Sequence, residues 1–294
     1  MQRKILLFGT SGQLGWELQR TLAPLGNVIG LDFPHIDLND YNRVGDLVNE
    51  IKPNLIVNAA AYTNVDKAES ESEKARNINS LAVMKMAEIA NRLGIGIIHY
   101  STDYVFDGTK NSPYIENDTT NPLNVYGATK LEGELFIQSI SHAYWIFRTS
   151  WVYSNRIGGF VNKVLEWAHT RAIVHIVDDQ ISNPTWCRML AETTALALSQ
   201  GRYNITDWII DTKGLYHVAG SGYCSRYDWA EEIIRNDSKK ELQKIRELVP
   251  AKTIDFSTPA ERPLFSAMNQ DSFNKKFLIN LPDWKYSLQL MNKI

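Results

Sequence analysis

A tyrosine and a lysine four residues apart are the first candidates for proton chemistry. They frame the segment Tyr126-Gly127-Ala128-Thr129-Lys130 and would share one face of a helix. An ammonium group beside a phenol lowers the pKa of the phenol, so Tyr126 could donate or accept a proton near neutral pH. Because the chain has 13 tyrosines, such a pair can also arise by chance. The hypothesis therefore needs support from the surrounding sequence.

Two hydroxyl groups provide part of that support. Ser101 and Thr102 close an expected strand, 95–101. The carboxyl ends of parallel strands face the ligand crevice, where a hydroxyl can hydrogen-bond a carbonyl as negative charge develops on its oxygen. A single threonine there is equally explained by its preference for strands. Together with Tyr126 and Lys130, Thr102 is predicted to be catalytic.

Three glycines near the start of the chain indicate a phosphate-binding loop. Gly9, Gly12 and Gly15 lie between an expected strand, 4–9, and an expected helix, 12–25. Glycines at these positions permit a tight turn, close approach of the backbone to a pyrophosphate and close packing of helix on strand. The helix N-terminus then offers free N–H groups to phosphates. The dinucleotide contacts predicted from this loop are Gly9, Ser11, Gly12, Gln13, Leu14 and Gly15.

An acidic residue follows the second expected strand, 28–32. Asp32 lies 20 residues after Gly12, where a carboxylate would accept hydrogen bonds from an adenosine ribose. Its charge would repel a 2′-phosphate and therefore favours NADH. A loop aspartate without a ligand remains the alternative. Asp37 and Leu38 follow and are predicted to lie near the adenine.

The composition excludes several classes of protein. The 294 residues are 44% hydrophobic and 22% charged, with a net charge of −2, so no basic surface for nucleic acid is expected. The apolar stretches are strand-sized, which argues against a membrane span, and the run 5–8 is too short for a signal peptide. The only cysteines, Cys187 and Cys224, suit a reduced, cytoplasmic setting.

The elements that must position these residues alternate between strands and helices. This alternation predicts an α/β protein with a Rossmann-type doubly wound parallel sheet. Residues 1–175 would form mainly the dinucleotide-binding domain, and 176–294 mainly a smaller substrate-binding lobe, with an interleaved boundary. The other expected strands are 55–58, 144–149, 173–177 and 215–219, the last returning to the sheet; the other expected helices are 40–51, 69–93 and 129–139.

Motifs in this order resemble the extended short-chain dehydrogenase/reductase family, and within it the reductases of nucleotide-linked 4-keto sugars. The resemblance spans nearly the whole chain. It implies reduction of the C4 ketone of dTDP-4-dehydro-β-L-rhamnose with NADPH and/or NADH, a step in dTDP-rhamnose and cell-surface polysaccharide biosynthesis. The motifs are the glycine loop, Asn58-Ala59-Ala60-Ala61-Tyr62-Thr63-Asn64-Val65-Asp66, Ser101-Thr102-Asp103-Tyr104-Val105-Phe106, Asn124-Val125-Tyr126-Gly127, Arg148-Thr149-Ser150-Trp151 and Arg262-Pro263.

The resemblance also implies roles for individual residues. Thr102 would polarise the sugar carbonyl and Tyr126 would give the proton. Lys130 would lower the pKa of Tyr126 and bind the nicotinamide ribose. The further contacts implied are Ala59, Ala60 and Ala61 to the cofactor, Asp103 to the substrate, Tyr104 and Trp151 to the sugar, and Arg262 to the diphosphate.

Some positions depart from the family pattern, and the role of one residue stays open. Ser182 stands where the family usually has glycine, and Gly158-Gly159 where it often has asparagines. For Arg148, a substrate contact and a structural ion pair are both possible. Some relatives bind Mg²⁺ through C-terminal glutamates; the last ten residues here contain none, so no metal site is expected.

The same residues bear on two other possible functions. A nucleotide-sugar dehydratase or epimerase would carry glutamate where this chain has Tyr104. A non-enzymatic nucleotide-binding subunit would not need the complete set of Thr102, Tyr126 and Lys130. The expected partner is a nucleotide sugar, without nucleic acid or membrane, and the expected state is a monomer or a homodimer.

Overall fold

Six parallel strands form the central sheet of the computed structural model, which describes residues 3–156, 158–201 and 203–293. Their order is β10-β5-β4-β3-β1-β2, so the strand order reverses between β1 and β3. This arrangement confirms the doubly wound, Rossmann-type sheet predicted from the sequence. The strands are β1 (Lys4–Phe8), β2 (Asn27–Leu31), β3 (Leu55–Asn58), β4 (Gly96–Thr102), β5 (Tyr144–Thr149) and β10 (Gly214–His217).

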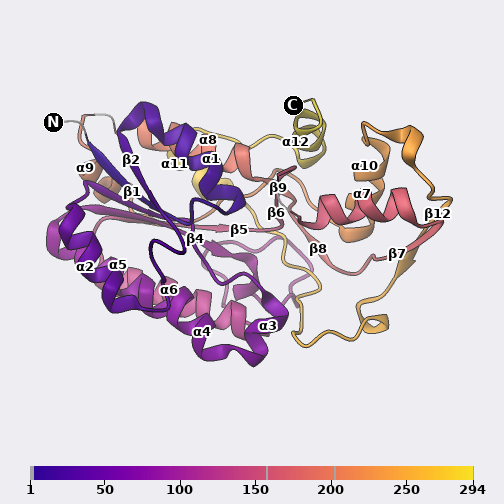
Figure 1. Cartoon of the computed structure of the whole chain (residues 1–294), viewed down its shortest axis with the longest axis horizontal. Helices are drawn as coiled ribbons and strands as arrows, with labels where there is room; N and C mark the ends of the chain where they lie inside the picture. The colour runs from indigo at the N-terminus through magenta and orange to yellow at the C-terminus, as the bar shows by residue number, and fades with distance from the viewer. Residues whose placement is uncertain (1–2, 157, 202, 294) are drawn as a thin grey trace.

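Helices cover both faces of this sheet (Figure 1). Two strands, β3 and β4, are buried along their whole length, so their apolar residues do not alternate with exposed polar ones; the polar residues of β4, such as His99 and Thr102, are buried as well. On one face lie α2 (Tyr41–Ile51), α5 (Ala82–Leu93) and α6 (Val125–Ile140). On the other lie α1 (Gln13–Leu22), α8 (Cys187–Ser199), α9 (Ile205–Asp211) and α11 (Asp271–Phe277).

The single helix expected over 69–93 is wrong in its first half. The chain instead forms α3 (Val65–Ser70), α4 (Ser72–Arg76) and a π-helical turn, Asn77–Leu81, before α5. The side chain of the buried Asn79 accepts from the backbone N–H of Tyr62 at 2.8 Å and donates to the Tyr62 carbonyl at 3.2 Å. This contact with a distant loop supports the π turn and fixes the segment after β3.

Helix α6 begins four residues earlier than expected. Asn124 caps it by accepting from the backbone N–H of Gly127 at 2.8 Å. The cap places Tyr126 in the first turn and Lys130 one turn further on the same face. The same asparagine donates to the carbonyl of Glu261 at 2.7 Å, which ties this turn to the loop that carries Arg262.

A second, smaller lobe is built from short elements of the C-terminal half (Figure 1). The expected strand 173–177 is present but pairs with β12 rather than with the central sheet. The 175/176 division stays a prediction, since α8 and α11 come from the later part of the chain yet pack with the sheet. The remaining elements are α7 (Phe160–Thr170), α10 (Arg226–Arg235), α12 (Trp284–Met291), β6 (Val152–Tyr153), β7 (Ile173–Val177), β8 (Ile181–Ser182), β9 (Thr185–Trp186), β11 (Cys224–Ser225) and β12 (Glu247–Ala251).

Across the described residues, the helices are all too short or too polar to cross a membrane.

Candidate active site

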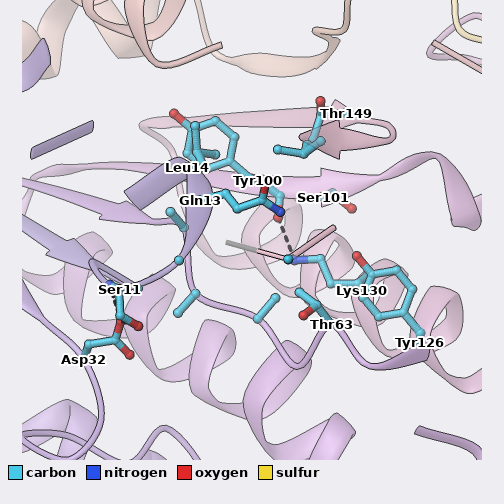
Figure 2. Close-up of a pocket in the computed structure, with 17 residues that line it drawn as sticks. Ser11, Gln13, Leu14, Asp32, Thr63, Tyr100, Ser101, Tyr126, Lys130 and Thr149 are labelled. Carbon is cyan, nitrogen blue, oxygen red and sulfur yellow. Dashed lines mark hydrogen bonds between the residues drawn. The ribbon is translucent and has the colours of Figure 1, made fainter. Parts of the chain in front are cut away.

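A cavity of about 420 Å³ opens at the carboxyl ends of β1, β3 and β4 (Figure 2). Doubly wound sheets bind ligands where the strand order reverses, and this cavity lies at that place. Residues not predicted as contacts also line it, among them Thr63, Ser101 and Thr149. The predicted cofactor residues that line it are Gly9, Ser11, Gly12, Gln13, Leu14, Asp32, Ala59, Ala60, Ala61, Tyr126 and Lys130.

The glycine loop requires glycine at two positions for different reasons. Gly9 has a φ of +85°, and a Cβ there would lie 2.6 Å from the backbone nitrogen of Ala60. A Cβ on Gly15 would lie 1.9 Å from the carbonyl oxygen of Gly9. Gly15 therefore allows α1 to pack against the loop and does not itself line the cavity.

Asp37 and Leu38 do not line this cavity either. The Asp37 carboxylate accepts from the backbone N–H of Asn39 at 2.9 Å, and Leu38 is buried in the core between the sheet and α2. Their local roles are a turn and a packing contact.

Asp32 joins the glycine loop to the end of β2 (Figure 2). Its Oδ2 accepts from the backbone N–H of Ser11 at 2.7 Å and from the Ser11 hydroxyl at 2.6 Å. Its Oδ1 accepts from the backbone N–H of Phe33 at 2.9 Å. These bonds hold a carboxylate at the cavity wall, where a ribose or a 2′-phosphate would meet it.

The Thr102 hydroxyl lies close enough to Tyr126 to lower the pKa of the phenol, against the effect of burial. The Thr102 hydroxyl also donates to Asp103 Oδ1 at 3.1 Å and accepts from the backbone N–H of Tyr104 at 3.1 Å. The only hydroxyl proton of Thr102 therefore points to Asp103 in this structure. Burial raises the pKa of Tyr126, so this residue holds its proton in the structure.

The ammonium group of Lys130 is bonded to β4 rather than to Tyr126. It donates to the carbonyl of Tyr100 at 2.6 Å and lies 3.1 Å from His99 Nε2 (Figure 2). Burial lowers the pKa of Lys130 to about 7 and, separately, raises that of Tyr126. The lowering of the Tyr126 pKa by Lys130 stays a prediction.

His99 is a buried residue that the sequence analysis missed. Its Nδ1 lies 3.1 Å from the side-chain nitrogen of Asn58, and Asn58 Oδ1 accepts from the backbone N–H of Ala60 at 3.1 Å. Burial holds the pKa of His99 well below its usual value, so the ring is neutral. The chain Asn58–His99–Lys130 fixes the lysine at the cavity wall.

Asp103 is buried behind Thr102 and is held by two serines. Its Oδ2 accepts from the Ser266 hydroxyl at 2.6 Å and from the Ser182 hydroxyl at 3.1 Å. Burial raises the pKa of Asp103 to about 6, while these hydrogen bonds oppose the shift. The departure at Ser182 thus has a structural role, since it supplies a donor to a buried carboxylate; Ser266 was missed, because it lies 163 residues away in the chain.

Tyr104 connects this cavity to a second one of about 290 Å³ in the smaller lobe. The rings of Tyr104 and Tyr126 meet edge to face, with centroids 5.8 Å apart. The Tyr104 hydroxyl interacts electrostatically with Arg226 and Arg262, which both line the second cavity. Arg262 also forms an ion pair with Asp66 at 2.8 Å.

Two further candidate site residues, Trp151 and Arg148, are held by contacts with neighbouring side chains. Trp151 has a φ of 40°, rare for a bulky residue, and stacks on Trp229 with ring centroids 5.4 Å apart. Arg148 forms a buried ion pair with Glu134 at 2.6 Å. Of the two roles left open for Arg148, the structure supports the structural one.

The first cavity fits a dinucleotide. The side-chain oxygens Gln13 Oε1, Ser101 Oγ and Thr149 Oγ1 are buried at its wall without a hydrogen-bond partner in the described part of the chain. Buried polar atoms of this kind require a partner. Helix α1, whose cap residue Gly12 makes no side-chain capping bond, starts beside them and leaves its first N–H groups free for phosphates.

A doubly wound sheet with this glycine loop, and with Thr102, Tyr126 and Lys130 at its carboxyl edge, defines an oxidoreductase of the extended short-chain dehydrogenase/reductase class. The chain belongs to the family whose model is described as RmlD substrate binding domain, which matches residues 3–294.

Relatives and solved structures are similar over almost the whole chain. The dTDP-4-dehydrorhamnose reductase of Escherichia coli (strain K12) is 42% identical over 292 residues, covering 98% of this chain and 96% of the relative. The structure of a dTDP-4-dehydrorhamnose reductase from Clostridium acetobutylicum is 33% identical, with a TM-score of 0.87 and 99% and 98% of the two chains covered. That of a dTDP-4-dehydrorhamnose reductase from Bacillus anthracis, in complex with NADP, is 30% identical, with a TM-score of 0.87 and 99% of each chain covered.

Proposed function

We propose that this chain reduces dTDP-4-dehydro-β-L-rhamnose to dTDP-β-L-rhamnose with NADPH or NADH, a step in dTDP-rhamnose biosynthesis. The relatives above carry the name of this activity, and one of them was solved with NADP. The observation that carries the proposal is the position of the Tyr126 hydroxyl. Tyr126 lines the first cavity, lies beside Thr102, and its ring contacts that of Tyr104, which leads to the arginine-lined cavity.

The residues of the first cavity would hold the nicotinamide cofactor as follows. Backbone N–H groups near Gly12 would bind the pyrophosphate, and Asp32 would accept from the adenosine ribose. Lys130 would donate to the nicotinamide ribose, since its ammonium lies at the cavity wall. When bound, the reduced cofactor supplies the hydride for the C4 carbon of the sugar.

The proton for the sugar oxygen comes from Tyr126. Burial raises the pKa of this phenol, so the group carries its proton when the substrate arrives. As the C4 oxygen gains negative charge, the Tyr126 hydroxyl donates to it. The Thr102 hydroxyl can then turn its proton from Asp103 toward the tyrosinate or the sugar oxygen, because its bond to Asp103 Oδ1 is 3.1 Å long and the carboxylate keeps two serine donors on Oδ2.

The substrate would be oriented from the side opposite the cofactor. Tyr104 and Trp151 would contact the sugar, and Arg262 would bind the diphosphate, since a guanidinium pairs with phosphate through two N–H groups. Asp103 would act through Thr102 rather than by direct contact, because serine hydroxyls occupy its Oδ2.

The experiment is steady-state turnover of the purified protein with the dTDP-linked 4-keto sugar. Net consumption of NADPH or NADH, with the C4 alcohol as product, is expected. Sugar conversion without net cofactor consumption would indicate a dehydratase or an epimerase instead, and cofactor binding without any conversion would indicate a binding protein. We also propose a cytoplasmic monomer or homodimer, which fractionation and light scattering test.

A further inference from the structure

One of the cationic side chains that line the second cavity, that of Arg226, has no role in the proposed mechanism. Its wall combines aromatic rings with two guanidinium groups; the rings are Phe160, Trp167 and Phe256, and the cations are Arg226 and Arg262. Such a wall suits a ligand with a planar, uncharged part and an anionic part. A nucleoside diphosphate has both.

The two arginines differ in how their charge is balanced. Arg262 pairs with Asp66, whereas Arg226 forms no ion pair with a carboxylate in the described part of the chain. Asp103 is close enough to Arg226 to interact electrostatically, but the hydroxyls of Ser182 and Ser266 occupy its Oδ2. A desolvated cation without a counter-ion costs free energy, so this position favours an incoming anion.

Aromatic rings hold the Arg226 guanidinium in place. Its central carbon lies 3.7 Å from the ring centroid of Trp151, 4.8 Å from that of Phe160 and 5.4 Å from that of Trp229. Stacking of this kind orients the planar group without using its N–H donors. The donors therefore stay available at the cavity wall.

The Tyr104 hydroxyl shows where these donors converge. It interacts electrostatically with both Arg226 and Arg262, so the two guanidinium groups lie near one phenol oxygen. The same tyrosine ring touches Tyr126. An anion bound by both arginines would therefore lie about one side chain away from the proton donor, as the diphosphate of a nucleotide sugar must.

We propose that Arg226 is a specificity-determining residue that, together with Arg262, binds the diphosphate of the substrate. The inference rests on the proposed function, because it assumes a nucleotide-sugar substrate for the adjacent catalytic group. On this proposal, the chain recognises its substrate through the diphosphate and not through the base alone. A purely structural role for Arg226, as a cap on the Trp151–Trp229 stack, predicts no dependence on phosphate.

The test compares binding of dTDP and of thymidine to the wild type, Arg226→Met and Arg226→Lys. Methionine keeps an apolar stem against the rings and removes the charge, whereas lysine keeps the charge. Arg235→Met is the matched control, because Arg235 lies on the same helix but is exposed and paired with Glu231 and Glu232. Tryptophan fluorescence reports binding, since Arg226 stacks on Trp151.

We expect Arg226→Met to weaken dTDP binding by about 10- to 100-fold, the range for a lost charge-assisted hydrogen-bonded contact. Thymidine binding and cofactor binding should change little, Arg226→Lys should regain part of the dTDP affinity, and Arg235→Met should resemble the wild type. In turnover, Arg226→Met should raise KM for the nucleotide sugar more than it lowers kcat.

Any of three results would overturn the proposal. One is unchanged dTDP affinity in a folded Arg226→Met protein. Another is an equal loss of dTDP and thymidine affinity, which would mean that Arg226 only shapes the aromatic wall. A wild type that binds no nucleoside diphosphate would also reject it. If the wild type binds dTDP through Arg226 but oxidises no NADPH or NADH with the 4-keto sugar, the proposed function fails while the diphosphate site stands.

Discussion

Replacing Thr102 by valine tests the hydroxyl at the centre of the site. The side chain is buried, and valine keeps its shape while removing one oxygen. Two hydrogen bonds are lost: the donation to Asp103 and the acceptance from the backbone N–H of Tyr104. Leaving that buried N–H without a partner should lower the free energy of unfolding by about 1–3 kcal/mol.

The effect on catalysis should be larger than the effect on folding. Without Thr102 Oγ1, the charge that develops on the sugar oxygen and on Tyr126 loses a donor. The loss of one such donor lowers kcat by about 10- to 10³-fold. Thr102→Ser restores the oxygen and should recover most of kcat and most of the stability.

The assay measures kcat from NADPH and NADH oxidation, with thermal denaturation and cofactor binding measured on the same preparations. Cofactor affinity should change little in both variants, because Thr102 does not line the first cavity. If Thr102 merely completed strand β4, valine would be the better residue, since it has the higher strand preference. A valine variant more active than the serine variant would therefore refute the catalytic role.

Five other substitutions, at four positions, test separate parts of the site. Tyr126→Phe should lower kcat by about 10²–10⁴-fold with cofactor affinity nearly intact, and near-normal kcat would reject its role as proton donor. Lys130→Met should lower kcat and weaken cofactor binding; unchanged affinity would mean that Lys130 does not reach the ribose. Asp32→Ala should raise the NADPH/NADH ratio of kcat/KM, and so should Asp32→Asn, which keeps an acceptor for Ser11; a ratio that stays the same or falls would place Asp32 away from the ribose. The pKa of Asp103 is about 6 in the folded protein against an ordinary 3.8, so the folded state binds this proton more tightly. The free energy of unfolding of the wild type relative to Asp103→Asn should therefore fall as the pH rises from about 4 to 6, by about 3 kcal/mol; a pH-independent difference in denaturant unfolding would contradict the assignment.

The features predictable from the sequence are those that depend on neighbours in the chain. The spacing of Gly9, Gly12 and Gly15 predicts the turn, because backbone clashes between the loop, α1 and the segment after β3 demand glycine. The strands 55–58 and 144–149 are found as predicted, since a buried parallel strand is apolar on both faces.

The features that could not be predicted depend on contacts across the fold. The break in the helix expected over 69–93 accompanies the bonds of Asn79 to the Tyr62 backbone, which no periodicity reveals. The bonds of Lys130 go to β4, about 30 residues away in the chain, and the Tyr-x-x-x-Lys spacing does not reveal them. Arg226 carried no motif, because only the fold brings it beside Trp151.

The start of α6 could have been found locally. Asn124 precedes Val125 and Gly127 with the spacing of a helix cap, and the cap bond to Gly127 is present. Placing the helix start there, rather than at 129, would have put Tyr126 in a first turn with its N-terminal N–H groups nearby.

The most direct test of the account is steady-state oxidation of NADPH and of NADH, measured in parallel, with the dTDP-linked 4-keto sugar and the purified wild-type protein. The account predicts that sugar addition starts net cofactor oxidation, that one C4 alcohol forms for each cofactor consumed, and that Tyr126→Phe loses this activity while still binding the cofactor. Sugar conversion without net oxidation of either cofactor, or no conversion at all by a folded protein that binds cofactor, would contradict it.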